Sequence, residues 1–154
     1  TMNQADLSQS LPGWMKEHVE LYFNNPEAGH NWRPPFSDVG SNVILHTLLM
    51  TTVGRKSGKQ LLLPLIYQPT GDGSYCIIAS KGGAPSHPAW FLNLQEQPEV
   101  EVKVAHEEFK AVARVAEGEE RERLWKIMSE HYPSYNDYQT ATDRKIPVVV
   151  LDKA

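Results

Sequence analysis

Apolar positions along the chain change from helical to strand spacing at about residue 43. Over 12–24 they recur at three- and four-residue intervals, which predicts an amphipathic helix. The following stretch, 26–42, is rich in Pro, Gly, Ser and Asn and predicts a loop. We expect this loop to be ordered, because Trp32 and Phe36 are costly to leave in water.

The rest of the chain alternates strand patterns with two helical patterns, predicted over 88–97 and 117–131. The first two strands are apolar on both faces, which favours a barrel covered by helices or by a partner subunit. This pattern predicts an α+β fold, a six-stranded and mostly antiparallel barrel with surrounding helices. The six expected strands are 43–52, 60–68, 74–80, 99–104, 109–115 and 146–152.

Length and composition indicate one domain overall, with an N-terminal helix and loop region over 1–42 and the barrel over 43–154. The chain has 154 residues and a net charge of -4, a balance that argues against a nucleic-acid partner. Its single cysteine, Cys76, sits in an apolar run and is expected to be a small buried residue. No leader pattern and no apolar run of ~18 residues is present. We expect a cytoplasmic protein without a transmembrane segment; peripheral membrane contact and the oligomeric state stay open.

Signatures of hydrolases and metal sites are missing from the sequence. There is no Gly-x-Ser-x-Gly elbow, and the six histidines lack metal-ligand spacing, so we expect no metal. His46 lies on an apolar strand and is expected to be a core residue.

Two turns carry candidate chemistry for binding an anion. GRKSGK (54–59) places Arg55, Lys56 and Lys59 on one turn, but it departs from the phosphate-loop spacing and can equally be a solvated hairpin tip. ASKGGAPSHPAWFLNL (79–94) can be a plain strand-to-helix turn or an anion cradle, with Ser86 expected to cap a helix. Simple alternation of a meander would place these turns at opposite strand ends, so their distance stays open.

Three tyrosines, Tyr132, Tyr135 and Tyr138, are spaced by three residues in YPSYNDYQ. If Pro133 begins a new helix, Tyr135 and Tyr138 share a face and Tyr132 flanks it. Such a cluster is either core packing or an aromatic lid whose hydroxyl groups point into a pocket.

In order and with nearly matching spacing, several segments resemble the deazaflavin-dependent nitroreductase family. They are TTVGRKSGK, LPLIY, ASKGGAPSHPAWFLNLQEQPEVEV, and YPSYNDYQ followed by TDRKIPVVV, which span about residue 43 to the C-terminus. The resemblance implies a split β-barrel related to flavin-binding oxidoreductases and implies coenzyme F420, whose flat ring suits stacking and whose phosphate and polyglutamate tail suit cations.

The resemblance also implies a role for each matching residue. The strand after the basic turn departs from the family pattern, because it carries Leu61 where the family often has an arginine. Tyr132, Tyr135 and Tyr138 would contact the substrate, and Tyr135, Tyr138 and Ser80 would take part in catalysis. The cofactor contacts would be Met50, Thr51, Arg55, Lys56, Ser57, Gly58, Lys59, Pro64, Ile66, Tyr67, Ile78, Ala79, Ser80, Lys81, Gly82, Trp90 and Tyr135.

We therefore predict an oxidoreductase that transfers a hydride from reduced F420 to an electron-poor small molecule. The expected acceptor is a quinone, a nitroaromatic or an α,β-unsaturated carbonyl compound. One alternative is an FMN-dependent reductase on the same barrel, and another is a non-catalytic F420 carrier.

Overall fold

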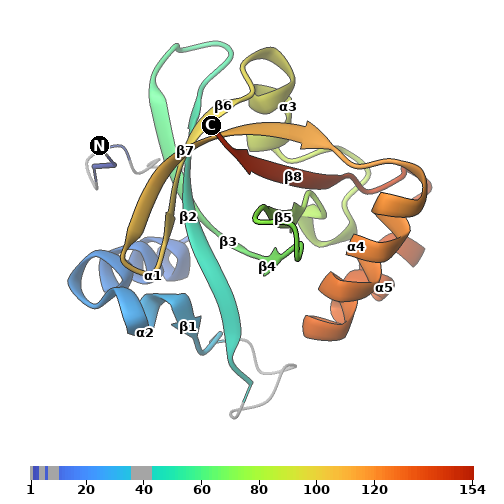
Figure 1. Cartoon of the computed structure of the whole chain (residues 1–154), viewed down its shortest axis with the longest axis horizontal. Helices are drawn as coiled ribbons and strands as arrows, with labels where there is room; N and C mark the ends of the chain where they lie inside the picture. The colour runs from blue at the N-terminus through green and yellow to red at the C-terminus, as the bar shows by residue number, and fades with distance from the viewer. Residues whose placement is uncertain (1, 4–5, 7–10, 36–42) are drawn as a thin grey trace.

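The computed structural model describes residues 2–3, 6, 11–35 and 43–154 (Figure 1). A curled antiparallel sheet forms the centre, with helices packed at its edges. The strands are β1 (Asn31–Trp32), β2 (Leu45–Val53), β3 (Gln60–Ile66), β4 (Gln68–Pro69), β5 (Tyr75–Ile78), β6 (Glu99–Val104), β7 (Glu107–Val115) and β8 (Val148–Lys153). The helices are α1 (Gly13–Asn24), α2 (Pro26–His30), α3 (Ala89–Glu96), α4 (Gly118–His131), α5 (Ser134–Thr140) and the 3-10 turn η2 (Lys81–Gly83).

The sheet runs in the order β1-β2-β6-β7-β8-β5-β4, and β3 also pairs with β2. All of these pairings are antiparallel. Strand β2 pairs on both sides, because Met50 lies opposite Leu63 of β3 and opposite Val102 of β6. The predicted barrel of six main strands is confirmed, and it is a split β-barrel.

Alternating residues of β5 and β8 separate two parts of the core. Ile77 and Leu151 pack inside the barrel with Met50. Cys76 and Val150 point the other way, toward the cluster that includes the apolar faces of α4 and α5. This alternation is expected, since successive side chains of a strand face opposite sides of a sheet. Cys76 is fully buried, as the sequence predicts.

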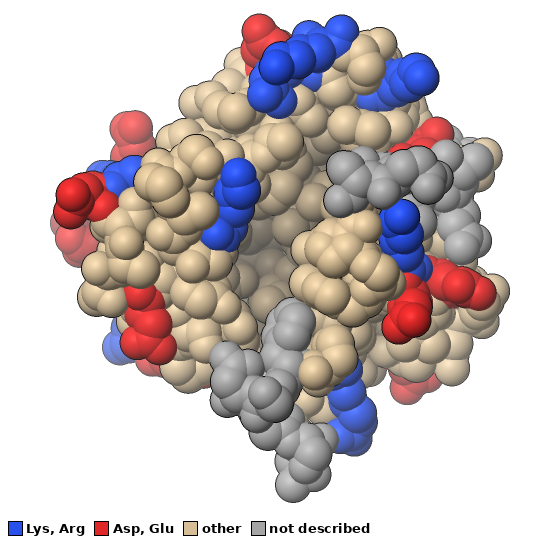
Figure 2. Space-filling view, turned by 180° about the vertical axis from the view of Figure 1, so that it is seen from behind, with Lys and Arg blue, Asp and Glu red and all other residues tan. Residues whose placement is uncertain are grey.

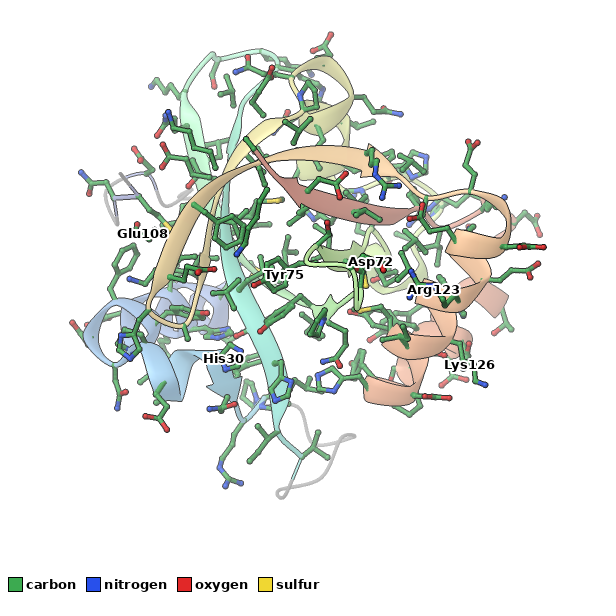
Figure 3. All side chains as sticks on the ribbon, viewed as in Figure 1. His30, Asp72, Tyr75, Glu108, Arg123 and Lys126 are labelled. Atoms are coloured by element: carbon green, nitrogen blue, oxygen red, sulfur yellow. The ribbon has the colours of Figure 1, made fainter. Side chains whose placement is uncertain are left out.

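Helices cover the barrel from separate sides (Figure 1). In this view, α1 and α2 lie together on one side, and α4 and α5 lie together on the other. Helix α4 is tied to the turn before β5, because Arg123 donates to the Thr70 carbonyl at 2.7 Å and to Asp72 at 3.1 Å (Figure 3). The first contact holds the backbone at Thr70 in place, whereas the second is an exposed ion pair that contributes little to stability.

Several expectations for the N-terminal part need correction. The stretch 26–42 is not loop throughout, because Pro26 begins α2 and the Asn25 side chain caps this helix by accepting from the Ala28 N–H group at 3.3 Å. Trp32 is buried as expected. Phe36 lies outside the described residues. In the described part of the chain, no helix is long and apolar enough to cross a bilayer.

The first three main strands do not form a simple meander, an arrangement that the sequence left open. Strand β5 does not continue beside β3; it pairs with β8, where Ile77 lies opposite Val149. The two-residue strand β4 pairs with β5 and leads the chain across the barrel. This crossing sends the segment after β5 back toward the end of the barrel where α3 begins.

Candidate functional site

A cavity of about 600 Å³ opens between α1, β3, η2, α3 and α5. Its wall is mainly apolar. Figure 2 shows a hollow on this face, with uncharged atoms inside it and basic side chains near its rim. The predicted site residues that line the cavity are Pro64, Ile66, Ile78, Ser80, Lys81, Gly82, Trp90, Tyr132, Tyr135 and Tyr138.

One wall of the cavity is the tight turn after β5. Lys81, Gly82 and Gly83 have φ angles of 46°, 62° and 83°, three successive residues in the left-handed region. Only glycine enters this region without steric cost, so Lys81 is held there by its surroundings. Within the described part of the chain, the N–H groups of Ser80, Lys81 and Gly82 donate no hydrogen bond to the protein. All three residues line the cavity, so their backbone N–H groups are candidates for hydrogen bonds with a ligand.

Arg144 holds this turn from behind, and sequence reasoning did not assign it a role. Its guanidinium group donates to the carbonyl oxygens of Ser80 at 2.7 Å, Ala84 at 2.8 Å and Ala79 at 3.2 Å. It also contacts Nδ1 of His87 at 3.0 Å. Because the carbonyl groups are bound by Arg144, the turn keeps its oxygens away from a cavity ligand. The one weak signal for this role was the place of Arg144 in the TDRKIPVVV segment.

An adjoining wall is the tyrosine cluster on α5 and just before it. The hydroxyl groups of Tyr132 and Tyr138 are 3.0 Å apart, and the rings of Tyr132 and Tyr135 pack edge to face at 5.0 Å. Burial raises the pKa of Tyr135 well above its usual range, so its hydroxyl stays protonated and can donate. The cluster therefore serves both as core packing and as part of the pocket, since Tyr132 and Tyr135 are buried and also line the cavity.

The basic turn lies between β2 and β3, beside the cavity rather than in its wall. Arg55 is tethered to α3, because its N–H group and its guanidinium both bind Oδ1 of Asn93, at 3.1 and 3.0 Å. Asn93 is buried, lines the cavity and donates to Thr52 at 3.3 Å. Lys56 and Lys59 are exposed at the tip. The turn at 80–82 therefore lines the cavity, and the basic turn lies next to it through Arg55 and Asn93, which settles the distance that the sequence left open.

The remaining predicted cofactor residues do not line the cavity. Met50 is fully buried in the barrel core, and Thr51 is buried next to it. The Tyr67 hydroxyl binds Nε2 of His30 at 2.6 Å, and burial raises its pKa to about 12. The complete set outside the lining is Met50, Thr51, Arg55, Lys56, Ser57, Gly58, Lys59, Tyr67 and Ala79.

Ser86 does not cap α3, contrary to expectation. Pro88 occupies the N-cap position, and no side chain caps the helix. The Ser86 hydroxyl instead accepts a hydrogen bond from Nζ of Lys81 at 3.3 Å. This contact keeps the Lys81 ammonium group close to its own turn.

A third wall, made of Trp14, His18 and Trp32, was missed by sequence reasoning. Trp32 stacks on His18 with 4.2 Å between ring centroids and on Trp14 with 5.6 Å. All three residues line the cavity. The sequence feature that could have indicated this wall is the four-residue spacing of Trp14 and His18, which places both side chains on one face of α1. Trp32 joins them only through tertiary packing.

Three other histidines stack away from the cavity. His46 lies between His30 and His131, with 5.1 Å between neighbouring centroids. His46 is half-buried and accepts from Gln68 at 3.3 Å, which agrees with its expected structural role. Among the described residues, no group of histidine, cysteine and acidic side chains has the arrangement of a metal site.

A split barrel whose cavity combines apolar walls, backbone donors and an adjacent basic turn suits the flavin- and deazaflavin-binding class of oxidoreductases. Residues 14–153 match the F420H(2)-dependent quinone reductase family. The chain belongs to this family and is an F420-dependent oxidoreductase. The family match confirms the resemblance and the coenzyme predicted from the sequence. The matched family is named for quinone reduction, whereas the resemblance was to nitroreductases.

Individual relatives agree with this assignment. An F420H(2)-dependent quinone reductase of Mycobacterium tuberculosis strain H37Rv is 39% identical over 110 residues, which cover 70% of this chain and 73% of the relative. The solved structure of an F420-H2 dependent reductase, FDR-A, is 44% identical with a TM-score of 0.63, covering 69% of this chain and 93% of the other. A structure described as a domain-swapped dimer is equally similar, at 44% identity and a TM-score of 0.63, over 69% and 79% of the two chains.

A distant structure shows how widely the fold is used. HutZ of Vibrio cholerae, described as a heme storage protein, is 16% identical with a TM-score of 0.55, covering 70% of this chain and 81% of its own. At this identity the likeness concerns the fold alone.

Proposed function

We propose that this oxidoreductase reduces a quinone in the cavity, with the coenzyme ring held against the turn at 80–82. One observation supports the proposal above all: the turn and the tyrosine cluster face a single apolar cavity, although they are about 50 residues apart in the chain. Nitroaromatic and α,β-unsaturated carbonyl compounds are electron-poor acceptors of similar shape, and we include them as further substrates.

The residues present fit coenzyme F420. Apolar side chains such as Pro64, Ile78 and Trp90 suit a flat ring, and the backbone N–H groups of the turn suit the oxygen atoms at its edge. Lys56 and Lys59 lie beside the cavity, where they suit a phosphate and an acidic tail. When bound, the reduced coenzyme supplies a hydride.

The side chains then have separate roles. Ser80 and the N–H groups of the turn orient the ring edge. Tyr135 and Tyr138 donate hydrogen bonds to the acceptor oxygen as negative charge grows on it, which stabilises the transition state. The raised pKa of Tyr135 makes it a poor proton source at neutral pH, so we assign it hydrogen bonding and assign no residue as general acid.

Met50, Thr51 and Tyr67 enter the proposal only indirectly. Their side chains are buried outside the cavity lining, so they support β2 and the strand end behind the pocket. Leu61 lines the cavity at the position where the family often has an arginine, which leaves the tail to Arg55, Lys56 and Lys59. We also propose that the protein is cytoplasmic. Contact with a membrane through α1 can be checked by binding to lipid vesicles.

The experiment compares two coenzymes and then follows turnover. We expect the protein to bind F420 more tightly than FMN by calorimetry, and to oxidise reduced F420 when menadione is added. Tight binding of FMN without binding of F420 would overturn the proposal in favour of the FMN reductase. Binding of F420 without turnover on quinones, nitroaromatics and enones would favour the carrier.

A further inference from the structure

His18 of α1 lines the cavity, and one of its ring nitrogens is buried without a hydrogen-bond partner in the described part of the chain. Among the described residues, two buried side-chain atoms make no hydrogen bond, Nδ1 of His18 and Oγ1 of Thr51. Only His18 lines the cavity, and it is 3% exposed. A buried polar atom without a partner destabilises the folded protein, so its presence here calls for a physical explanation.

The contacts of His18 fix which nitrogen carries the proton. Nε2 lies 2.9 Å from the Gly29 carbonyl oxygen, which can only accept, so Nε2 is the N–H donor. The Thr47 hydroxyl donates to the same carbonyl oxygen at 2.7 Å and therefore accepts from Nε2 at 3.1 Å. Burial lowers the pKa of His18 to about 4, so the ring is neutral at pH 7. Nδ1 is left as a lone-pair acceptor.

The stacked rings beside His18 favour a flat ligand. Trp32 is nearly parallel to His18, with 7° between the ring planes, and Trp14 is 17° from parallel with Trp32. Aromatic walls of this kind bind planar molecules by stacking and leave orientation to the few polar groups present. Here that polar group accepts a hydrogen bond, whereas Ser80, Lys81 and Gly82 provide donors on another wall.

We propose that His18 Nδ1 accepts a hydrogen bond from an O–H or N–H group of the aromatic electron acceptor. The inference rests on the proposed function, because it describes the acceptor bound in the same cavity. A bare quinone carbonyl would direct its lone pairs at the lone pair of Nδ1, which is unfavourable. His18 therefore selects acceptors that carry a hydroxyl or N–H group away from the carbonyl being reduced, and it is a specificity-determining residue.

A binding experiment with redox-inert probes tests this selection without the coenzyme. Calorimetry compares 2-naphthol with 2-methoxynaphthalene, which share the ring system and differ in the donor. We expect wild-type protein to bind 2-naphthol roughly two- to tenfold more tightly, the range of one net hydrogen bond. In His18→Phe the aromatic ring remains against Trp32 and the Gly29 carbonyl keeps its Thr47 donor, but Nδ1 is gone. The preference should then disappear.

His18→Met provides a second variant with a flexible apolar side chain, in case Phe is not accommodated. Equal binding of the two probes by wild-type protein would overturn the inference, as would a preference that persists in either variant. Neither result depends on F420 or on turnover. Failure of the proposed function, by contrast, would appear as absent F420 oxidation with the probe preference intact.

Discussion

Gly83 and Tyr138 approach so closely that no side chain fits between them. A Cβ atom on Gly83 would lie 2.7 Å from the carbonyl oxygen of Tyr138 and 3.1 Å from its Cα atom. The turn with the backbone donors and the helix with the tyrosines are therefore in direct backbone contact. The width of the cavity between these two walls depends on this contact.

Gly83→Ala should push the turn away from α5 and weaken coenzyme binding. The substitution adds strain of about 1–2 kcal/mol at φ +83° and also forces the turn away from α5. We expect at least about a tenfold loss of F420 affinity, measured by fluorescence titration. Gly71→Ala is the matched control, because Gly71 has φ +92° and a Cβ atom added there would meet nothing within 4 Å. Equal loss of affinity in both variants would mean that backbone contact with Tyr138 is irrelevant.

Arg144→Lys should impair coenzyme binding even though the charge is kept. A lysine ammonium group cannot bind three carbonyl oxygens and His87 from one position, and the part-buried acceptors that it leaves unpaired make the turn less stable. We expect weaker F420 binding and a raised KM for F420, with partial rescue of Arg144→Ala by dilute guanidinium ions.

The control for this substitution is Arg114→Lys. Arg114 forms surface ion pairs with Glu120 and Asp152, and its side chain is 46% exposed. Such pairs contribute about 0–1 kcal/mol, so F420 binding should not change. If Arg144→Lys bound F420 as tightly as Arg114→Lys does, the positioning role of Arg144 would be disproved.

Lys56→Ala should weaken F420 binding most at low salt. The Lys56 ammonium group is exposed beside the cavity, and its attraction for an acidic tail is screened as ionic strength rises. We expect a loss of roughly two- to fivefold at low salt that shrinks toward none near 1 M salt, where the Debye length is about 3 Å. Lys126→Ala on α4, far from the basic turn (Figure 3), should leave affinity unchanged. A loss independent of salt would argue against a charge role.

Acid should destabilise the fold through its buried histidines. The pKa of His18 is lowered by burial from 6.5 to about 4, and the pKa values of His30 and His131 are lowered by burial and then by His46. The unfolded chain therefore binds more protons, so stability is complete above pH 6.5 and falls as the pH drops toward 4. His18 alone accounts for about 3 kcal/mol. Urea unfolding across this range should show a shallower decline in His18→Phe, and an unchanged decline would contradict the assignment to His18.

The main elements are predicted well from the sequence because they depend on local patterns. Helices α1, α3 and α4 and the six main strands follow apolar periodicity, and Cys76 follows its apolar run. The pairing of β5 with β8 is a contact between segments about 70 residues apart, which no local pattern encodes.

The candidate site shows the same division. Residues carried over from family motifs, such as Ser80 and Tyr138, do line the cavity. Arg144, Asn93 and His18 were missed, because their importance lies in which distant backbone or side-chain atoms they meet after folding. Met50 faces the core instead of the cavity, since the direction of a buried strand residue is set by the curl of the barrel.

The most direct measurement of the central claim is a single-turnover oxidation of reduced F420 by menadione, with and without deuterium at the carbon that donates the hydride. If the protein orients coenzyme and quinone together in the cavity, oxidation should be fast, and it should be slower with the deuterated coenzyme. Tyr138→Phe, which removes one hydroxyl from the cavity, should slow the same step. Absence of protein-dependent oxidation, or oxidation at a rate that neither deuterium nor Tyr138→Phe changes, would contradict hydride transfer at this site.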